Sequence, residues 1–78
     1  MAELLEYLVR QLVDAPDAVR VEPVERDDAL VYQLYVAPDD VGKVIGRQGR
    51  IARALRTVVR AGSGASGDRR RVVLEIVE

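Results

Sequence analysis

The sequence predicts a two-layer α+β domain in which helices cover a three-stranded sheet, in the order helix, strand, strand, helix, helix, strand. Three observations lead to this fold class. Leucines and valines recur at helical spacing near the N-terminus, apolar and polar residues alternate in three later stretches, and a turn bracketed by glycines separates two further helical stretches. A chain of 78 residues has room for one core, so residues 1–78 are expected to form a single domain.

The first element is predicted to be an amphipathic helix that ends before Pro16. Its apolar residues recur at intervals of three and four with charged residues between them, and the residue before a proline disfavours helical backbone. The apolar residues are Leu4, Leu5, Leu8, Val9, Leu12 and Val13. Tyr7 lies in the same stretch and is expected to pack against the domain.

Two strands are predicted to follow as a hairpin. The first begins with Val19 and Val21, the turn is Arg26-Asp27-Asp28, and the second strand alternates Leu30, Tyr32, Leu34 and Val36 with residues of its other face. Proline has no backbone N–H, so Pro23 places the first strand at a sheet edge or marks a bulge. Tyr32 alternates with core-facing residues and is expected to pack.

A short helix is predicted from the segment Pro38-Asp39-Asp40 to about Ile45, with an aspartate as its cap. A second helix is predicted over residues 50–60. On a helical wheel its apolar side comprises Ile51, Ala54, Leu55 and Val58, and the opposing arc comprises Arg50, Arg53, Arg56 and Arg60. Residues 62–68, rich in glycine and serine, predict a connector, and residues 71–77 predict a last strand with Val72, Leu74 and Ile76 facing one way.

The charges of the chain are separated along its length, although the formal net charge is only −1. Residues 1–40 hold three arginines against ten acids, a net −7, whereas residues 41–78 hold nine basic residues against three acids, a net +6. A basic face is what a nucleic-acid-binding protein needs, whatever the total charge. An ordinary solvated charge pattern is the alternative.

The composition argues against several other functions. The chain has no cysteine and no histidine, and it shows no catalytic triad and no metal-ligand spacing, so we expect no enzyme activity, no metal, no cofactor and no small-molecule substrate. No apolar run approaches the roughly 20 residues that cross a bilayer, and no signal peptide is evident. We therefore expect a cytoplasmic protein that does not associate with membranes.

The stretch Val44-Ile45-Gly46-Arg47-Gln48-Gly49-Arg50-Ile51 is the candidate binding site. Glycine reaches left-handed backbone angles and lets main-chain N–H groups approach a ligand closely. The turn precedes a predicted helix, whose N-terminal amides and dipole attract anions such as phosphate. The side chains of Arg47 and Gln48 are expected to point away from the turn and to contact a nucleic-acid backbone. The full predicted site is Lys43, Val44, Ile45, Gly46, Arg47, Gln48, Gly49, Arg50, Ile51 and Arg53.

Simpler explanations exist for several of these features. For the two glycines, the alternative is that they only permit a tight turn between helices. Arg56 and Arg60 fit either a phosphate contact or a solvated helix face, and the cluster Arg69-Arg70-Arg71 either widens the binding surface or protects an edge strand from aggregation. Val44, Ile45, Ile51 and Ala54 are expected to be mostly core.

The element order and the Gly46-Arg47-Gln48-Gly49 loop together resemble the type II KH domain over nearly the whole chain. The length and the single domain also resemble the KhpA family of small bacterial RNA-binding proteins. This resemblance implies a GXXG loop that contacts about four nucleotides of single-stranded RNA with low sequence specificity. It also implies that an aliphatic edge beside the turn serves as a floor for the bases. It also implies a role as a post-transcriptional regulator or RNA chaperone, and a homodimer or a heterodimer with a KhpB/Jag-type RNA-binding protein.

Two rival functions remain open from the sequence. One is a protein-interaction module that keeps the KH fold without binding nucleic acid. The other is the binding of single-stranded DNA, because phosphate is common to both polymers.

Overall fold

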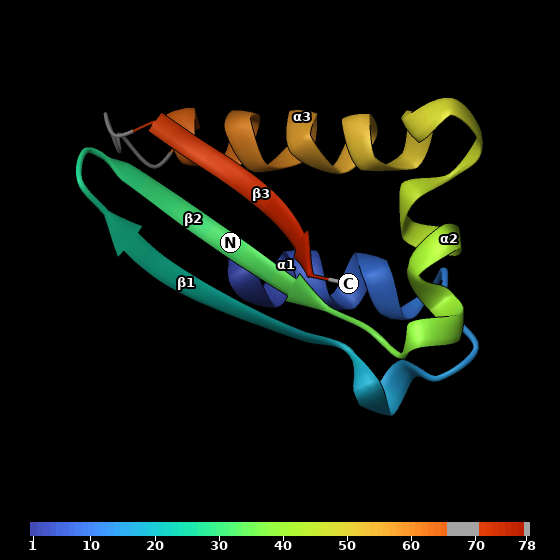
Figure 1. The fold of residues 1–78 in the computed structure, drawn as a ribbon. Coiled ribbons are helices and arrows are strands. Elements are labelled where there is room, and N and C mark those ends of the chain that lie inside the picture. The colour runs from blue at the N-terminus through green and yellow to red at the C-terminus, as the bar shows by residue number, and fades with distance from the viewer. Residues whose placement is uncertain (66–70, 78) are drawn as a thin grey trace.

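The computed structural model describes residues 1–65 and 71–77, with only the backbone of residues 64 and 65. Its helices are α1 (Ala2–Arg10), α2 (Val41–Ile45) and α3 (Arg50–Ala65), and its strands are β1 (Arg20–Arg26), β2 (Ala29–Tyr35) and β3 (Arg71–Val77). Single 3₁₀ turns lie at Pro16–Ala18, Pro38–Asp40 and Arg47–Gly49. The predicted element order and the α+β fold class are confirmed (Figure 1).

The three strands form one sheet in the order β1-β2-β3. β1 and β2 pair antiparallel across the hairpin, whereas β2 and β3 pair in parallel. Parallel neighbours need a long crossover connection, and α2 and α3 provide it. Pro23 lies in β1, at an edge of the sheet as predicted, and it pairs with Tyr32 of the central strand.

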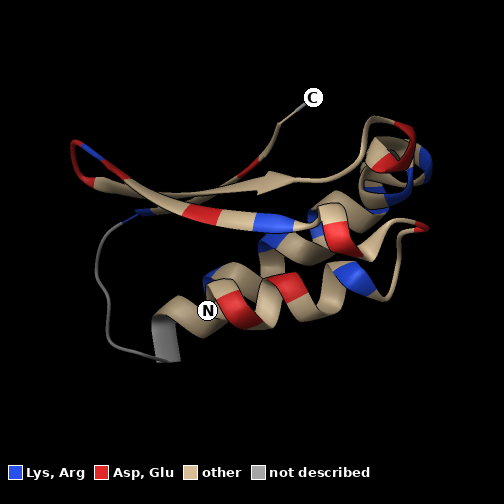
Figure 2. Ribbon diagram, turned by 90° about the horizontal axis from the view of Figure 1, so that it is seen from below, with Lys and Arg blue, Asp and Glu red and all other residues tan. Residues whose placement is uncertain are grey.

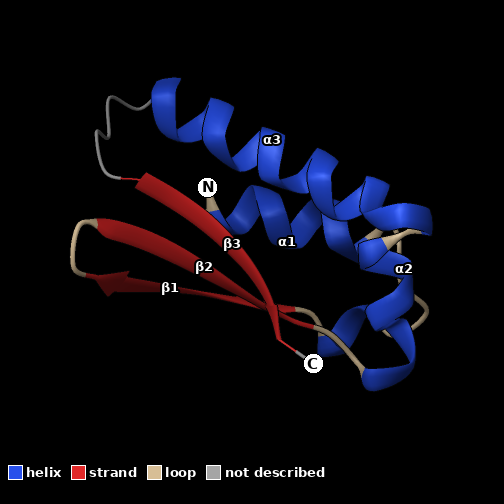
Figure 3. Cartoon of the chain, turned by 45° about the horizontal axis from the view of Figure 1, so that its top comes forward, coloured by secondary structure: helices blue, strands red, loops and turns tan. Residues whose placement is uncertain are grey.

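Helices α1 and α3 lie side by side against one face of the sheet, and the core lies between these layers (Figure 3). The strands alternate their side chains, so every second residue reaches the core. Tyr32 is buried among these residues, as predicted. The core comprises Leu5, Val9, Val19, Val21, Leu30, Tyr32, Leu34, Val44, Leu55, Val59 and Leu74.

The apolar side of α3 differs in part from the prediction. The buried residues are Ala52, Leu55 and Val59, whereas Ala54 is exposed and Val58 is only half-buried. Both sets repeat at helical spacing, so the sequence alone leaves the rotation of the helix ambiguous by about one residue, or about 100°. Packing against the sheet selects the set centred on Leu55.

The helix ends also differ from the prediction. Helix α1 ends at Arg10, so Leu12 lies beyond it and is exposed, and the predicted packing of Tyr7 is wrong because 60% of that residue is exposed. Helix α3 continues to Ala65 through the predicted connector. Gly62 lies inside this helix against the end of the Met1 side chain, so it makes a packing contact rather than a bend. Residues 66–68 of the predicted connector lie outside the described residues.

Leu34→Ala is expected to reduce the free energy of unfolding by about 2–5 kcal/mol, because Leu34 is fully buried and the truncation leaves a cavity. Leu4→Ala is the matched control, since Leu4 is 47% exposed on α1. It should change the same quantity by about 0.5 kcal/mol or less. Chemical denaturation followed by circular dichroism measures both. Equal effects of the two substitutions would contradict this assignment of the core.

Candidate nucleic-acid interface

The glycine turn lies between α2 and α3, at the end of the sheet where β2 leaves the core (Figure 1). Three of its residues have left-handed backbone: Gly46 at φ 76°, Gln48 at φ 57° and Gly49 at φ 74°. Backbone hydrogen bonds close each side of the turn, from the Gly46 amide to Gly42 O (2.9 Å) and from the Gly49 amide to Gly46 O (3.1 Å). The turn is therefore a fixed structure with two outward residues at its tip.

The two glycines are required to different degrees. Gly46 has ψ 173° with its positive φ, a region that is essentially reserved for glycine. A Cβ atom there would also lie 2.7 Å from Cγ1 of Ile51. At Gly49 the space around a Cβ atom is open, so only the positive φ favours glycine. Gly46 is needed for packing as well as for the turn.

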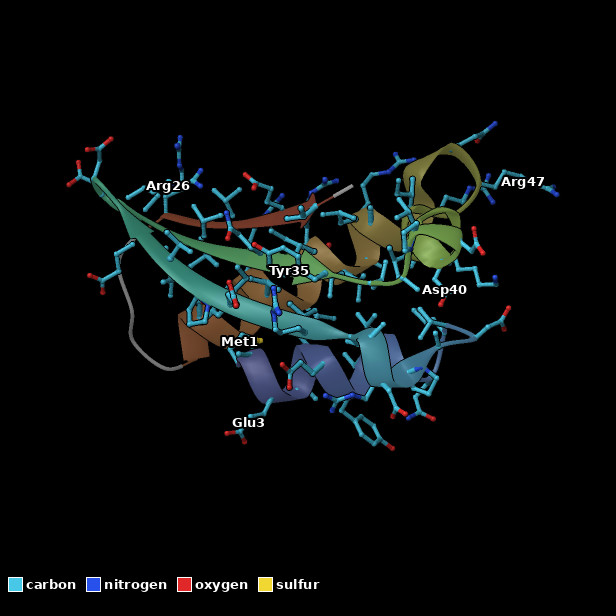
Figure 4. The ribbon with its side chains drawn as sticks, turned by 60° about the horizontal axis from the view of Figure 1, so that its bottom comes forward. Met1, Glu3, Arg26, Tyr35, Asp40 and Arg47 are labelled. Atoms are coloured by element: carbon cyan, nitrogen blue, oxygen red, sulfur yellow. The ribbon has the colours of Figure 1, made fainter. Side chains whose placement is uncertain are left out.

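Arg47, Gln48 and Arg50 are exposed, as the predicted site requires. Figure 4 shows the Arg47 side chain projecting away from the body of the molecule at this end. One guanidinium and one neutral amide thus stand at the tip of the turn, and a second guanidinium opens α3 behind them. This arrangement suits contact with phosphate and ribose oxygens.

Arg53 has a role that the sequence did not indicate. Its Nη2 atom donates a hydrogen bond to the backbone carbonyl of Gln48 over 2.6 Å. The bond joins the first turn of α3 to a non-glycine residue with positive φ, and so stabilises that conformation. The sequence predicts Arg53 as a phosphate contact, and in the structure one of its N–H donors is bound to the turn itself.

Lys43 is held by two carboxylates. Its Nζ lies 3.0 Å from Oδ2 of Asp14 and 3.2 Å from Oδ1 of Asp40. Asp40 in turn is only 2% exposed and accepts hydrogen bonds from the backbone amides of Asp14 (3.2 Å) and Ala15 (3.0 Å). A phosphate contact from Lys43, as predicted, would have to be shared with these carboxylates.

The prediction that an aspartate caps this helix is therefore wrong for Asp40. Asp40 occupies the position before α2, but its side chain makes no capping hydrogen bond to that helix. Its carboxylate satisfies amides in the segment after α1 instead, 25 and 26 residues earlier in the chain. A contact at this separation has no local signal in the sequence. It joins the segment after α1 to the beginning of α2.

These contacts shift the pKa values of both charged groups. Burial acts to raise the pKa of Asp40, but hydrogen bonds from Ala15, Asp14 and Lys43 together outweigh it and hold that pKa below its ordinary value. Hydrogen bonds to Asp14 and Asp40 raise the pKa of Lys43. Both shifts favour the charged forms, so the cluster is an ion pair at neutral pH.

The aliphatic residues around the turn divide between the core and the surface. Val44 is fully buried, whereas Ile45 and Ile51 are half-buried and Ile51 packs against the core. The predicted aliphatic edge beside the turn is formed by these two isoleucines. Ala54 is exposed, so the prediction that it is mostly core is wrong.

A groove between α3 and the edge strand β3 brings together arginines that the sequence presents as two separate clusters. Arg56 and Arg60 of α3 and Arg71 of β3 line it, over a floor that includes Val59, Val72 and Leu74, and its volume is about 490 Å³. The crossover places the beginning of β3 beside the C-terminal half of α3. Arg69 and Arg70 of the predicted cluster lie outside the described residues.

Several basic residues lie at the end of the molecule that α2 and the beginning of α3 form, and others are spread over α1, the rest of α3 and the strands (Figure 2). Acidic residues lie beside them, among them the carboxylates that hold Lys43. Within residues 1–65 and 71–77, no group of three acidic residues is placed to hold a metal ion, and no helix is long and apolar enough to cross a membrane. The exposed basic turn is thus the best candidate site in this part of the chain.

Comparison with known proteins gives matches over nearly the whole chain. A family model described as KhpA/KhpB, KH domain, matches residues 2–76. The RNA-binding protein KhpA of Clostridium acetobutylicum is 49% identical over 77 residues, which cover 99% of this chain and 100% of that protein. The protein of the same name from Listeria monocytogenes is 47% identical over 78 residues, 100% of both chains. That of Borreliella burgdorferi is 46% identical over 76 residues, 97% of this chain and 90% of the relative.

Substitution of the two glycines should separate their roles. Gly49→Ala is expected to cost about 1–2 kcal/mol of unfolding free energy, for a left-handed alanine in open space. Gly46→Ala should cost more, because about 1–3 kcal/mol of backbone strain is joined by displacement of Ile51. Urea denaturation of the two variants tests the order, and a larger loss for Gly49→Ala would show that the packing around Gly46 is wrongly assigned.

The stability of the protein should depend on Asp40 in a pH-dependent way. The pKa of Asp40 is lower in the folded state than the unfolded value of about 3.9, so its ionised form adds stability above that pH. This contribution is lost as the pH falls through the folded-state pKa. Asp40→Asn should therefore be clearly less stable than the unmodified protein at pH 7, and the gap should shrink toward pH 3. Denaturation curves across this range measure the gap, and a gap independent of pH would refute the role of the carboxylate charge.

Proposed function

The chain belongs to the KhpA/KhpB family of KH domains, and from this premise we propose that it is an RNA-binding protein that holds single-stranded RNA at the Gly46–Gly49 turn. The observation that supports this most directly is the geometry of the turn. Two glycines with positive φ hold Arg47 and Gln48 outward at the tip. A turn needed only for packing has no use for an exposed cation at that place.

The backbone contacts are proposed to come from three side chains and from the turn itself. Arg47 and Arg50 supply charge for phosphates, Gln48 supplies a hydrogen-bonding amide, and the small glycines permit close approach of the polymer. The beginning of the 16-residue helix α3 adds its positive dipole end. Lys43 and Arg53 stay in the proposed site as neighbours with partners of their own within the protein.

Low sequence specificity follows from these contacts. Phosphate contacts fix the position of the polymer but do not read its bases. The half-buried Ile45 and Ile51 offer the bases an aliphatic floor, and the three tyrosines of the chain lie outside the turn, so no aromatic stacking platform adjoins it. The arginine-lined groove between α3 and β3 could extend this contact along the helix.

The proposal includes binding rather than catalysis, and a partner besides RNA. A site for about four nucleotides is small, so useful affinity is expected to need a second linked site. We propose a homodimer, or pairing with a larger KhpB/Jag-type protein, in cytoplasmic RNA regulation or chaperoning. The first part of this proposal rests on the size of the site and the second on the family.

The proposed site is tested by fluorescence anisotropy with a short unstructured RNA, comparing the unmodified protein with Arg47→Asp/Gln48→Asp. Binding by the unmodified protein should weaken as salt rises, with a slope of about −0.7 in log K against log salt for each phosphate contact. The variant should lose at least about tenfold in affinity, since it replaces the cation and the amide by two anions.

The chain offers a matched control in the same dipeptide elsewhere. Arg10-Gln11 is exposed at the end of α1, and Arg10→Asp/Gln11→Asp makes the same change of charge outside the turn. This control should retain binding. An equal loss of RNA affinity in both variants would show that the effect comes from net charge alone. Absence of binding by the unmodified protein would favour the protein-interaction module, and equal affinity for a DNA strand of the same sequence would favour a site for either polymer.

A further inference from the structure

The face of the sheet opposite the helices is covered by no element of the described chain, as Figure 2 shows. We call it the open face, and it consists of the strand residues that alternate with the core residues. Figure 4 shows Arg26 and Tyr35, both on this face, at different positions along the hairpin strands. The open face carries both apolar and charged side chains, so the arrangement of its charges says more about what it binds than its hydrophobicity does.

The strand register arranges the middle of the open face in three rows that cross all three strands. Glu22, Gln33 and Glu75 form an acidic row. Val24, Val31 and Val73 form a valine row next to it. Arg26, Ala29 and Arg71 form a basic row on the other side of the valines.

This pattern is complementary to itself. A twofold axis that lies parallel to the valine row turns the open face of a second copy onto the first and reverses the strand direction. The valine rows then coincide, and the acidic row of each copy lies over the basic row of the other. Glu22 meets Arg26 of the second copy, and Glu75 meets Arg71.

Each charged residue of the two rows thus faces the opposite charge. Isologous contact of this kind is how most homodimers form. We propose that the open face binds the open face of a second copy, valine row on valine row and acidic row on basic row.

The expected association is weak. Three strands spaced by about 4.8 Å and seven residues of about 3.3 Å give a footprint of roughly 14 by 23 Å. This is about 330 Å², well below the roughly 800 Å² per partner of a stable complex. Val31 is only 5% exposed within one copy, and Val24 and Val73 are half-buried, so a second copy would cover little further apolar area. We therefore expect dimers at high micromolar concentration or above.

Within one copy, the charges of the face already form exposed pairs, Arg20 with Glu22 (3.1 Å) and Arg26 with Glu75 (3.7 Å). Their side chains are 44–61% exposed, so these pairs contribute little to stability and remain accessible to a second copy. The proposal names a surface for the pairing in the proposed function and rests on that pairing, but not on RNA binding.

The test uses charge reversal on β1, away from the glycine turn. Glu22→Arg alone places a new arginine over Arg26 of the second copy, and Arg26→Glu alone places a new glutamate over Glu22 of the second copy. Each single variant should dimerise about tenfold more weakly, because the twofold axis places the same repulsive contact at two points of the interface. The two single variants mixed together, and the double variant Glu22→Arg/Arg26→Glu, should regain the unmodified affinity. Sedimentation equilibrium over a range of concentrations to about 1 mM measures these constants.

Glu3→Arg serves as the matched control, because Glu3 is exposed on α1, on the other side of the sheet (Figure 4). It makes the same change in net charge as Glu22→Arg and should leave dimerisation unchanged. A protein that stays monomeric throughout, or single variants that dimerise as the unmodified protein does, would overturn the proposal, and so would a failure of the mixture to regain affinity. Fluorescence anisotropy with RNA on the same samples tests the proposed function separately, since the substituted residues lie outside the turn.

Discussion

The parallel pairing of β2 with β3 is the constraint on which the arrangement of this molecule depends. The chain must leave the sheet at one end and return to the other before β3 can begin. Helix α3, with 16 residues at 1.5 Å each, spans about 24 Å, and a seven-residue strand spans about 23 Å. The glycine turn therefore has to lie at one end of the sheet, where the return begins. The same return places the arginines of α3 and β3 around one groove.

The buried carboxylate of Asp40 positions the beginning of this crossover. It joins the amides after α1 to the residue that precedes α2, and Lys43 closes the cluster from the helix side. Helix α2 has only five residues and cannot be stable alone. Its orientation thus depends on this contact and on the burial of Val44. The exposed turn follows α2, and α2 is held in place by the Asp40 cluster and by the buried side chain of Val44.

Much of this could be predicted from the sequence because the signals are local. Alternation in the strands, the donor missing from Pro23 and the glycines of the turn each reflect the chemistry of a few neighbouring residues. The features that were missed depend on distant parts of the chain. Asp40 binds amides 25 and 26 residues earlier, and Gly62 lies against the side chain of Met1. The sequence does not determine the rotation of α3, and so the burial of Ala54, because two sets of residues have the same spacing and only the sheet distinguishes them.

The contact between Gly46 and Ile51 has a consequence for how this motif is read in other chains. Selection on folding alone is enough to keep Gly46, because its backbone angles and its neighbour exclude any side chain. A relative that had given up RNA would still retain that glycine, while the residues at the tip of the turn could drift toward neutral or acidic types. Evidence for retained binding in a diverged sequence thus lies at the positions of Arg47 and Gln48. The presence of the first glycine indicates chiefly that the fold is kept.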